Sequence, residues 1–298
     1  MKKIYLSDSG PKVSEAVYGF WRWDAETENA PQKMERIVNL CLELGINTFD
    51  HADIYGHGLA ESWFGDVIAK KSFKREDIVL FTKCGISLPN HNQPGIRIKH
   101  YNTSREHIKE SLDNSLKRLK TDYIDIFLLD HLDPLSNLEE TAITLAQLKE
   151  SGKVKNIGVA NFTVFQHQLL ASVLRFPIVT NHIELNLLQT EPLENGQLDY
   201  IKQRFMRPLA SSPLAGGDIA NSTDHKALAV RSVLEKLAPK YNADIESLAV
   251  AWIVSLGAIP LIGTTNEARI HHVADAFNFE LDRQDWYQLY AASTNQKY

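Results

Sequence analysis

The chain has 298 residues, of which 44% are hydrophobic and 23% are charged, and its formal net charge is −5. This composition is typical of a folded globular protein and differs from that of disordered or collagen-like chains. A net negative charge without a basic stripe argues against nucleic acid as a partner.

The first predicted element is a hairpin. Two stretches, residues 2–6 and 12–17, flank the turn-rich sequence Asp8-Ser9-Gly10-Pro11. We expect this N-terminal β-hairpin to cap the bottom of the structure that the following residues form.

Through the rest of the chain, short apolar runs rich in β-branched residues alternate with amphipathic stretches, the pattern of repeated strand–helix units. The predicted strands span residues 16–18, 47–50, 78–82, 124–129, 156–160, 178–183, 208–211 and 258–262. The predicted helices span residues 31–44, 59–71, 105–119, 138–151, 164–174, 226–241 and 245–256. A closed barrel is favoured because it gives every parallel strand two neighbours, and no G-x-G-x-x-G motif indicates an open sheet. We therefore predict an α/β fold, a (β/α)8 or TIM barrel, as one domain over residues 1–298.

Nothing in the sequence indicates export or membrane insertion. The N-terminus lacks an apolar core of signal-peptide length, and the longest apolar run, residues 248–262, is interrupted by Gly257 and Pro260. The two cysteines, Cys41 and Cys84, form neither a disulfide framework nor a metal-binding pair. We expect a cytoplasmic protein without membrane contact, present as a monomer or small homo-oligomer.

Polar side chains end several predicted strands, which is where the functional residues of TIM barrels lie. They are Asp50, Lys83, Asp130, His131, Asn161 and Glu184. Each one alone is typical of a solvated loop or a helix cap. The set indicates a site, because the ammonium of Lys83 would lower the pKa of Tyr55 and Asp50 would hold the lysine in place. We predict a proton relay in which Tyr55 is the proton donor and is kept acidic by Lys83 and Asp50.

Three segments resemble the aldo-keto reductase family, and in particular its bacterial NADPH-dependent oxidoreductases. They are residues 48–56 (TFDHADIYG), 81–85 (FTKCG) and 157–162 (IGVANF), and the likeness extends from the first strand to about Arg269. The resemblance implies hydride transfer from NADPH to the carbonyl carbon of a small-molecule aldehyde or ketone. In this scheme Tyr55 protonates the carbonyl oxygen, Lys83 tunes Tyr55, and Asp50 holds Lys83.

The resemblance also implies a set of NADPH-binding residues. Asn161 would contact the nicotinamide carboxamide, the loop after the seventh strand would surround the pyrophosphate, and the segment ending at Arg269 would bind the adenosine 2′-phosphate. The guanidinium and backbone N–H groups of that last segment suit an anion, which favours NADPH over NADH. The full set is Gly19, Asn161, His182, Ser212, Leu214, Gly216, Gly263, Thr264, Thr265 and Arg269.

The substrate pocket departs from the family pattern. Trp21 matches an aromatic residue that walls the pocket in the family, although a core role fits it equally. Asp130 stands where the family has a histidine that orients the carbonyl, and the histidine is displaced to His131. An ionised Asp130 would raise the pKa of Tyr55, whereas a protonated Asp130 could donate a hydrogen bond. Because strand side chains alternate between faces, Asp130 and His131 both reach the pocket only if the strand ends or bulges there.

The cofactor site departs from the pattern as well. Ser211 stands where the family has a stacking aromatic residue, and His182 replaces a glutamine. Ala160 replaces a serine, and Asn266 replaces a lysine. These changes would weaken NADPH binding, and loss of a stacking ring alone costs roughly 0.5–1.5 kcal/mol.

Two other functions remain open, and a third, a metal-dependent hydrolase, ranks far lower. The departures favour a weak or inactive NADPH-binding barrel that acts as a redox sensor or binds a partner, and a carboxyl at position 130 also fits a branch of the family that reduces conjugated double bonds. A metal-dependent hydrolase would need a His-x-His pair at the first strand, which instead ends in Gly19-Phe20-Trp21-Arg22, so we predict no metal site. Residues 88–101 are expected to form a long loop that contacts substrate.

Overall fold

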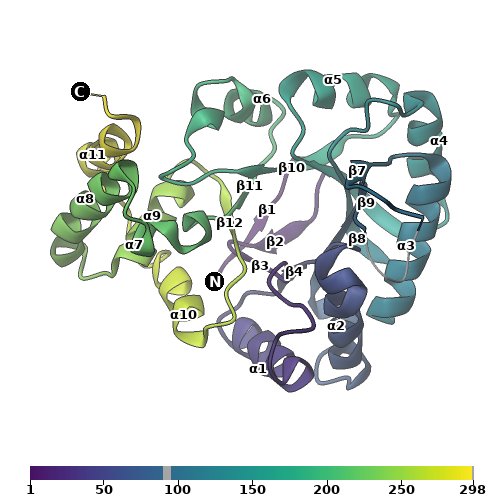
Figure 1. Ribbon diagram of the computed structural model, residues 1–298, viewed down its shortest axis with the longest axis horizontal. Coiled ribbons are helices and arrows are strands. Elements are labelled where there is room, and N and C mark those ends of the chain that lie inside the picture. The colour runs from purple at the N-terminus through teal and green to yellow at the C-terminus, as the bar shows by residue number, and fades with distance from the viewer. Residues whose placement is uncertain (90–94, 297–298) are drawn as a thin grey trace.

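The computed structural model describes residues 1–89 and 95–296 and contains a closed barrel of parallel strands surrounded by helices (Figure 1). Its strands are β3 (Val17–Gly19), β4 (Thr48–Asp50), β5 (Val79–Cys84), β8 (Ile124–Asp130), β9 (Val154–Ala160), β10 (Ile178–Glu184), β11 (Leu209–Ser211) and β12 (Ile259–Ile262). They pair in chain order, and β12 closes the barrel on β3 with Leu261 opposite Val17. The predicted (β/α)8 barrel is confirmed.

The helices lie outside the strands in Figure 1. They are α1 (Ala30–Glu43), α2 (Leu59–Ala69), α3 (Arg105–Leu119), α4 (Leu138–Glu150), α5 (Val164–Val173), α6 (Gln197–Gln203), α7 (Asp218–Asn221), α8 (His225–Tyr241), α9 (Ile245–Val254), α10 (Glu267–Asp275) and α11 (Arg283–Thr294). All the predicted helices are present, and their ends differ from the prediction by less than one turn. The sequence analysis missed α6, α7, α10 and α11. None of the helices in the described ranges is long and apolar enough to cross a membrane.

The N-terminal hairpin consists of β1 (Lys3–Tyr5) and β2 (Lys12–Ser14), which pair antiparallel. Leu6 and Val13 are fully buried in the core inside the barrel, where they join Phe81 and Ile126. The carbonyl of Leu6 accepts a hydrogen bond of 2.8 Å from the backbone N–H of Arg207, which lies just before the start of β11. The hairpin therefore closes the end of the barrel at which the strands start, as predicted.

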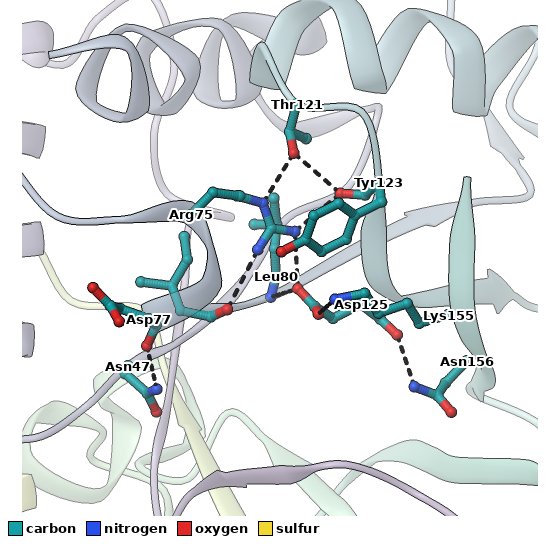
Figure 2. Close-up of polar contacts among 10 residues, drawn as sticks. Asn47, Arg75, Asp77, Leu80, Thr121, Tyr123, Asp125, Lys155 and Asn156 are labelled. Carbon is teal, nitrogen blue, oxygen red and sulfur yellow. Dashed lines mark hydrogen bonds and ion pairs between the residues drawn. The ribbon is translucent and has the colours of Figure 1, made fainter. Parts of the chain in front are cut away.

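A polar cluster ties three strands together at that same end, as Figure 2 shows. Arg75 Nη2 lies 2.8 Å from Asp125 Oδ2, which also accepts a hydrogen bond from the backbone N–H of Leu80. Lys155 Nζ lies 3.1 Å from the other carboxylate oxygen, and both cations stack on the ring of Tyr123. The cluster links the start of β5 to β8 and β9 and fixes their relative positions, leaving the opposite end of the barrel for the functional residues.

Candidate active site

The strands that end next to one another at the barrel mouth carry the predicted catalytic side chains. Asp50 is the last residue of β4, Lys83 lies near the end of β5, and Asp130 is the last residue of β8. Because β4, β5 and β8 are neighbours in the barrel, the three side chains gather at one place.

Lys83 and Asp50 form a buried ion pair. Lys83 Nζ donates to both carboxylate oxygens of Asp50, at 2.7 and 2.6 Å, and to the carbonyl of His51 at 2.8 Å. The Lys83 side chain is 2% exposed and that of Asp50 is fully buried. Burial alone would lower the pKa of Lys83, but Asp50 and Tyr55 together raise it above its ordinary value, so the lysine is charged.

Tyr55 begins a short 3-10 helix, η1 (Tyr55–Gly58), directly after β4. Its ring packs against Lys83, whose Nζ lies 4.8 Å from the ring centroid. Burial raises the pKa of Tyr55 to about 12, with Lys83 opposing that rise and Asp50 adding to it. Lys83 lowers the pKa of Tyr55, as expected, but burial outweighs it and the net pKa is raised. The expectation of an acidic Tyr55 is therefore wrong. Tyr55 holds its proton at neutral pH.

Asp130 accepts two hydrogen bonds on one carboxylate oxygen. Asn161 Nδ2 donates to Asp130 Oδ1 at 2.8 Å, and His131 Nδ1 lies 2.8 Å from the same atom. Burial raises the pKa of Asp130, but the contacts with His131, Lys83 and Asn161 outweigh it and the net pKa lies below the ordinary value. Of the two states that the sequence left open, the ionised one is therefore supported.

His131 is held on two sides. The strand β8 ends at Asp130, and His131 adopts a left-handed backbone conformation with φ 65°, so the two side chains escape the alternation of a strand. The imidazole stacks on the ring of Tyr101, with 4.5 Å between centroids and 10° between planes. Tyr101 belongs to β7 (His100–Tyr101), which pairs with β6 (Ile86–Ser87).

Two buried histidines lie beside this cluster and are neutral. Burial lowers the pKa of His182 to about 4, even though Asp50 and Asp130 favour the charged form. Burial, together with Lys83, also holds the pKa of His51 well below its ordinary value, and its ring stacks on Phe20 at 4.1 Å. Within the described part of the chain, neither ring nitrogen of His51 has a hydrogen-bond partner. Both rings thus add bulk but no charge.

A separate groove of about 60 Å³ lies between the loops that follow β3, β11 and β12. Its lining includes the predicted residues Trp21, Ser212, Leu214, Gly216, Gly263, Thr264 and Arg269. Thr265 is not part of this lining; Asn161 and His182 belong to the barrel mouth, and Gly19 lies inside the barrel beside Asp50. The predicted cofactor residues therefore fall into two groups.

Trp21 lies in this groove with the candidate cofactor residues. A Cβ atom at Gly263 would come within 2.2 Å of Trp21 Nε1, so a residue without a side chain is needed there. Arg22, which the sequence analysis missed, stacks its guanidinium on the Trp21 ring at 4.5 Å and donates through Nη2 to the carbonyl of Gly216 at 2.7 Å. Its position just beyond a strand end could have identified it.

The groove residues fit a nucleotide that carries phosphates. Ser212 and Thr264 offer hydroxyls, and Arg269 lies in the first turns of α10, whose N-cap is Asn266. The Arg269 side chain is 35% exposed, and its Nε lies 3.1 Å from Glu246 Oε1. A helix N-terminus with a reachable guanidinium is suited to an anion.

A larger cavity of about 400 Å³, lined by both polar and apolar residues, lies between η1, β6, β7 and α3. Its lining includes Asp53, Ile54, His57, Ser87, His100, Asn102, His107, Ser111, Asn114 and Arg118. The predicted substrate loop contributes Leu88, Ile96 and His100, whereas its residues 90–94 lie outside the described residues. The sequence analysis missed the cavity because its walls come from segments far apart in the chain.

Comparison with known proteins identifies the family. The sequence model of a protein family, described as "Aldo/keto reductase family", matches residues 15–293 of the chain. The chain belongs to the aldo/keto reductase family. It is therefore an oxidoreductase, and its resemblance to the family extends over almost the whole chain.

Curated relatives of this aldo/keto reductase include two bacterial proteins named 6-dehydroglucose reductase. That of Agrobacterium fabrum is 37% identical over 97% of both chains. That of Novosphingobium aromaticivorans is 34% identical over 98% of this chain and 95% of the relative. Among solved structures, a glycerol dehydrogenase from Gluconobacter oxydans shares the fold with a TM-score of 0.86 and 22% identity, covering 99% of this chain and 97% of its own.

Asp53 generates a prediction about pH. Burial raises its pKa from the ordinary 3.8 to about 7, against the hydrogen bond that Ser111 Oγ donates at 2.6 Å. Because the folded pKa is raised, the stability that Asp53 contributes is complete below about pH 4 and is lost as the pH rises to about 7. As the pH rises from 4 to 8, the free energy of unfolding of Asp53→Asn should therefore increase relative to that of the wild type by more than ~1.4 kcal/mol. This energy corresponds to a shift of one pKa unit.

The measurement is urea unfolding of both proteins across this pH range. Ser111→Ala provides a matched comparison, because removing the hydroxyl that favours the carboxylate should move the loss of stability to higher pH. Identical pH dependence in wild type and Asp53→Asn would contradict the assignment.

Proposed function

We propose that the protein reduces aldehyde or ketone groups with NADPH and that Tyr55 protonates the carbonyl oxygen. The observation that carries this proposal is the buried Lys83–Asp50 pair packed against the ring of Tyr55. When bound, NADPH supplies the hydride, and the remaining chemistry is proton transfer by the protein.

Tyr55 and Lys83 act at different stages of the reaction. The raised pKa keeps Tyr55 protonated before reaction, as a general acid must be. Negative charge develops on its oxygen only as the proton leaves, and the Lys83 ammonium stabilises that charge. Since Asp50 and the carbonyl of His51 fix the ammonium, it does not have to reorganise during the transfer. The stabilisation thus favours the transition state over the ground state.

Asp130 and His131 together take the place of the carbonyl-orienting group. Ionised Asp130 raises the pKa of Tyr55 and fixes the imidazole of His131 through Nδ1. With Nδ1–H pointing at the carboxylate, Nε2 donates to a substrate only when the ring carries both protons. An ionised Asp130 is a hydrogen-bond acceptor only.

NADPH is the proposed cofactor, because its 2′-phosphate suits Arg269 at the start of α10. The groove residues Ser212, Leu214, Gly216, Gly263 and Thr264 would hold the pyrophosphate and adenosine. Asn161 and His182, at the barrel mouth, would hold the nicotinamide end. Trp21 would then contact the cofactor in the groove as well as the substrate.

The proposed substrate is an aldehyde with several hydroxyl groups, such as a hexose oxidised at C6. Two relatives at 37% and 34% identity carry the name 6-dehydroglucose reductase. The cavity beside Ile54, the residue before Tyr55, supplies hydroxyl, amide and imidazole groups that match hydroxyls.

Tyr55→Phe should lower kcat/KM for NADPH-dependent reduction about 10²- to 10⁴-fold, because it removes the proton that the carbonyl oxygen receives. NADPH binding, followed as quenching of tryptophan fluorescence, should change less than twofold. Tyr5→Phe, at an exposed position of the hairpin, is the control. Binding without turnover in the wild type would favour a non-catalytic NADPH-binding barrel, and absence of binding would refute the oxidoreductase proposal.

His131→Phe should lower kcat/KM about 100-fold, comparable to the loss of one donor to a reacting oxygen. Phenylalanine keeps the planar ring against Tyr101 but has no N–H group. His225→Phe, on the exposed start of α8, serves as the control. Unchanged activity in His131→Phe would exclude the histidine as a donor.

The substrate proposal is tested with a pair of aldehydes of similar size. A hexose with an aldehyde at C6 should give a kcat/KM at least tenfold higher than cyclohexanecarbaldehyde, which lacks hydroxyls. Two matched hydrogen bonds of about 1 kcal/mol each suffice for this ratio. Equal or reversed preference would show that the polar groups of this cavity do not recognise the substrate.

A further inference from the structure

The Arg269 guanidinium already has a partner inside the protein. Its Nε lies 3.1 Å from Glu246 Oε1, in the first turn of α9. The second oxygen of Glu246 lies 3.4 Å from His272 Nδ1, one turn beyond Arg269 on α10. Glu246 is 12% exposed, so it sits beneath the guanidinium rather than beside it in solvent.

The surroundings of Glu246 add negative charge. Asp244 caps the N-terminus of α9 through hydrogen bonds from the backbone N–H groups of Glu246 and Ser247, and these bonds help hold its pKa below the ordinary value. The Asp244 carboxylate lies 3.6 Å from His272 Nδ1. Glu246 thus pairs with Arg269, and Asp244 adds a second carboxylate beside His272 on the same helix.

We propose that Glu246 sets the choice between NADPH and NADH. This inference rests on the proposed function, in which Arg269 meets the 2′-phosphate of NADPH. Glu246 orients Arg269 through Nε and leaves the two terminal nitrogens of the guanidinium for an anion. Its negative charge also offsets part of the attraction that Arg269 exerts on a phosphate, and the low exposure of Glu246 limits screening by salt.

The two effects of Glu246 act differently on the two nucleotides. Both gain from an ordered groove, but only NADPH places a dianion near the carboxylate. The structure therefore assigns Glu246 as a specificity-determining residue that weakens the preference for NADPH and lets the protein accept NADH.

Glu246→Gln separates charge from orientation. The glutamine keeps an oxygen beside Arg269 Nε, but the negative charge is gone. The variant should bind NADPH about tenfold more tightly and NADH within twofold of the wild type, with dissociation constants measured by tryptophan fluorescence. Adenosine 2′-monophosphate should also gain about tenfold, whereas adenosine 5′-monophosphate should not.

Glu35→Gln is the matched control. Glu35 lies on α1, outside the groove lining, and its partner is the exposed Lys70 at 2.6 Å. Because solvent screens such a charge, this variant should change the NADPH to NADH ratio less than twofold. A comparable thermal midpoint in both variants verifies that they are folded.

The outcomes distinguish this inference from the proposed function. An unchanged or lower affinity of Glu246→Gln for NADPH, or an equal gain for NADH, overturns the role of Glu246. A wild type that binds neither nucleotide overturns both proposals. If the wild type binds NADPH and Tyr55→Phe keeps full activity, only the proposed catalysis is overturned. The ratio of NADPH affinity to NADH affinity still tests Glu246 in that case.

Discussion

Lys83 and Asp50 form an ion pair that is sealed within the barrel mouth, and the arrangement of the neighbouring groups depends on it. Removing two charges from water is unfavourable, and their attraction compensates only with close geometry and further hydrogen bonds. The structure meets this requirement with two short contacts to the carboxylate and a third to the carbonyl of His51. Since either partner alone would be an uncompensated buried charge, the pair is better explained by function than by stability.

The pair also determines the electrostatics of the groups around it. Burial raises the pKa of Tyr55, Lys83 opposes that rise, and Asp50 and Asp130 add to it, so Tyr55 retains its proton. His182 lies in the same field, yet burial keeps it neutral. Lys83 thus places a cation against the phenol ring of Tyr55.

Much of this site follows from local sequence, and the rest depends on tertiary contacts. Apolar runs located the strands, and adjacency of the second and third strands was enough to bring Asp50 and Lys83 together. The net pKa of Tyr55 was predicted with the wrong direction, because burial depends on packing that no motif reports. The backbone turn at His131, with φ 65°, ends the strand alternation on which the sequence argument relied.

Other features escaped prediction for the same reason. The 400 Å³ cavity combines residues of η1 and α3, and Glu246 meets Arg269 from a different helix, so no sequence spacing links them. The helices α10 and α11 were missed although both have polar N-caps, Asn266 and Asp282. Side chains that act together across helices need the fold before they can be identified.

The two cations of the site are held by carboxylates in different ways, and this difference separates their functions. Lys83 is enclosed and uses both oxygens of Asp50, so its position is fixed and its charge serves one neighbouring oxygen. Arg269 is a third exposed and is engaged by Glu246 through Nε, which leaves its outer nitrogens to bind an anion. A buried, doubly held cation suits chemistry that requires an unchanging field, whereas a cation shared with a carboxylate suits binding whose strength is adjusted by that carboxylate.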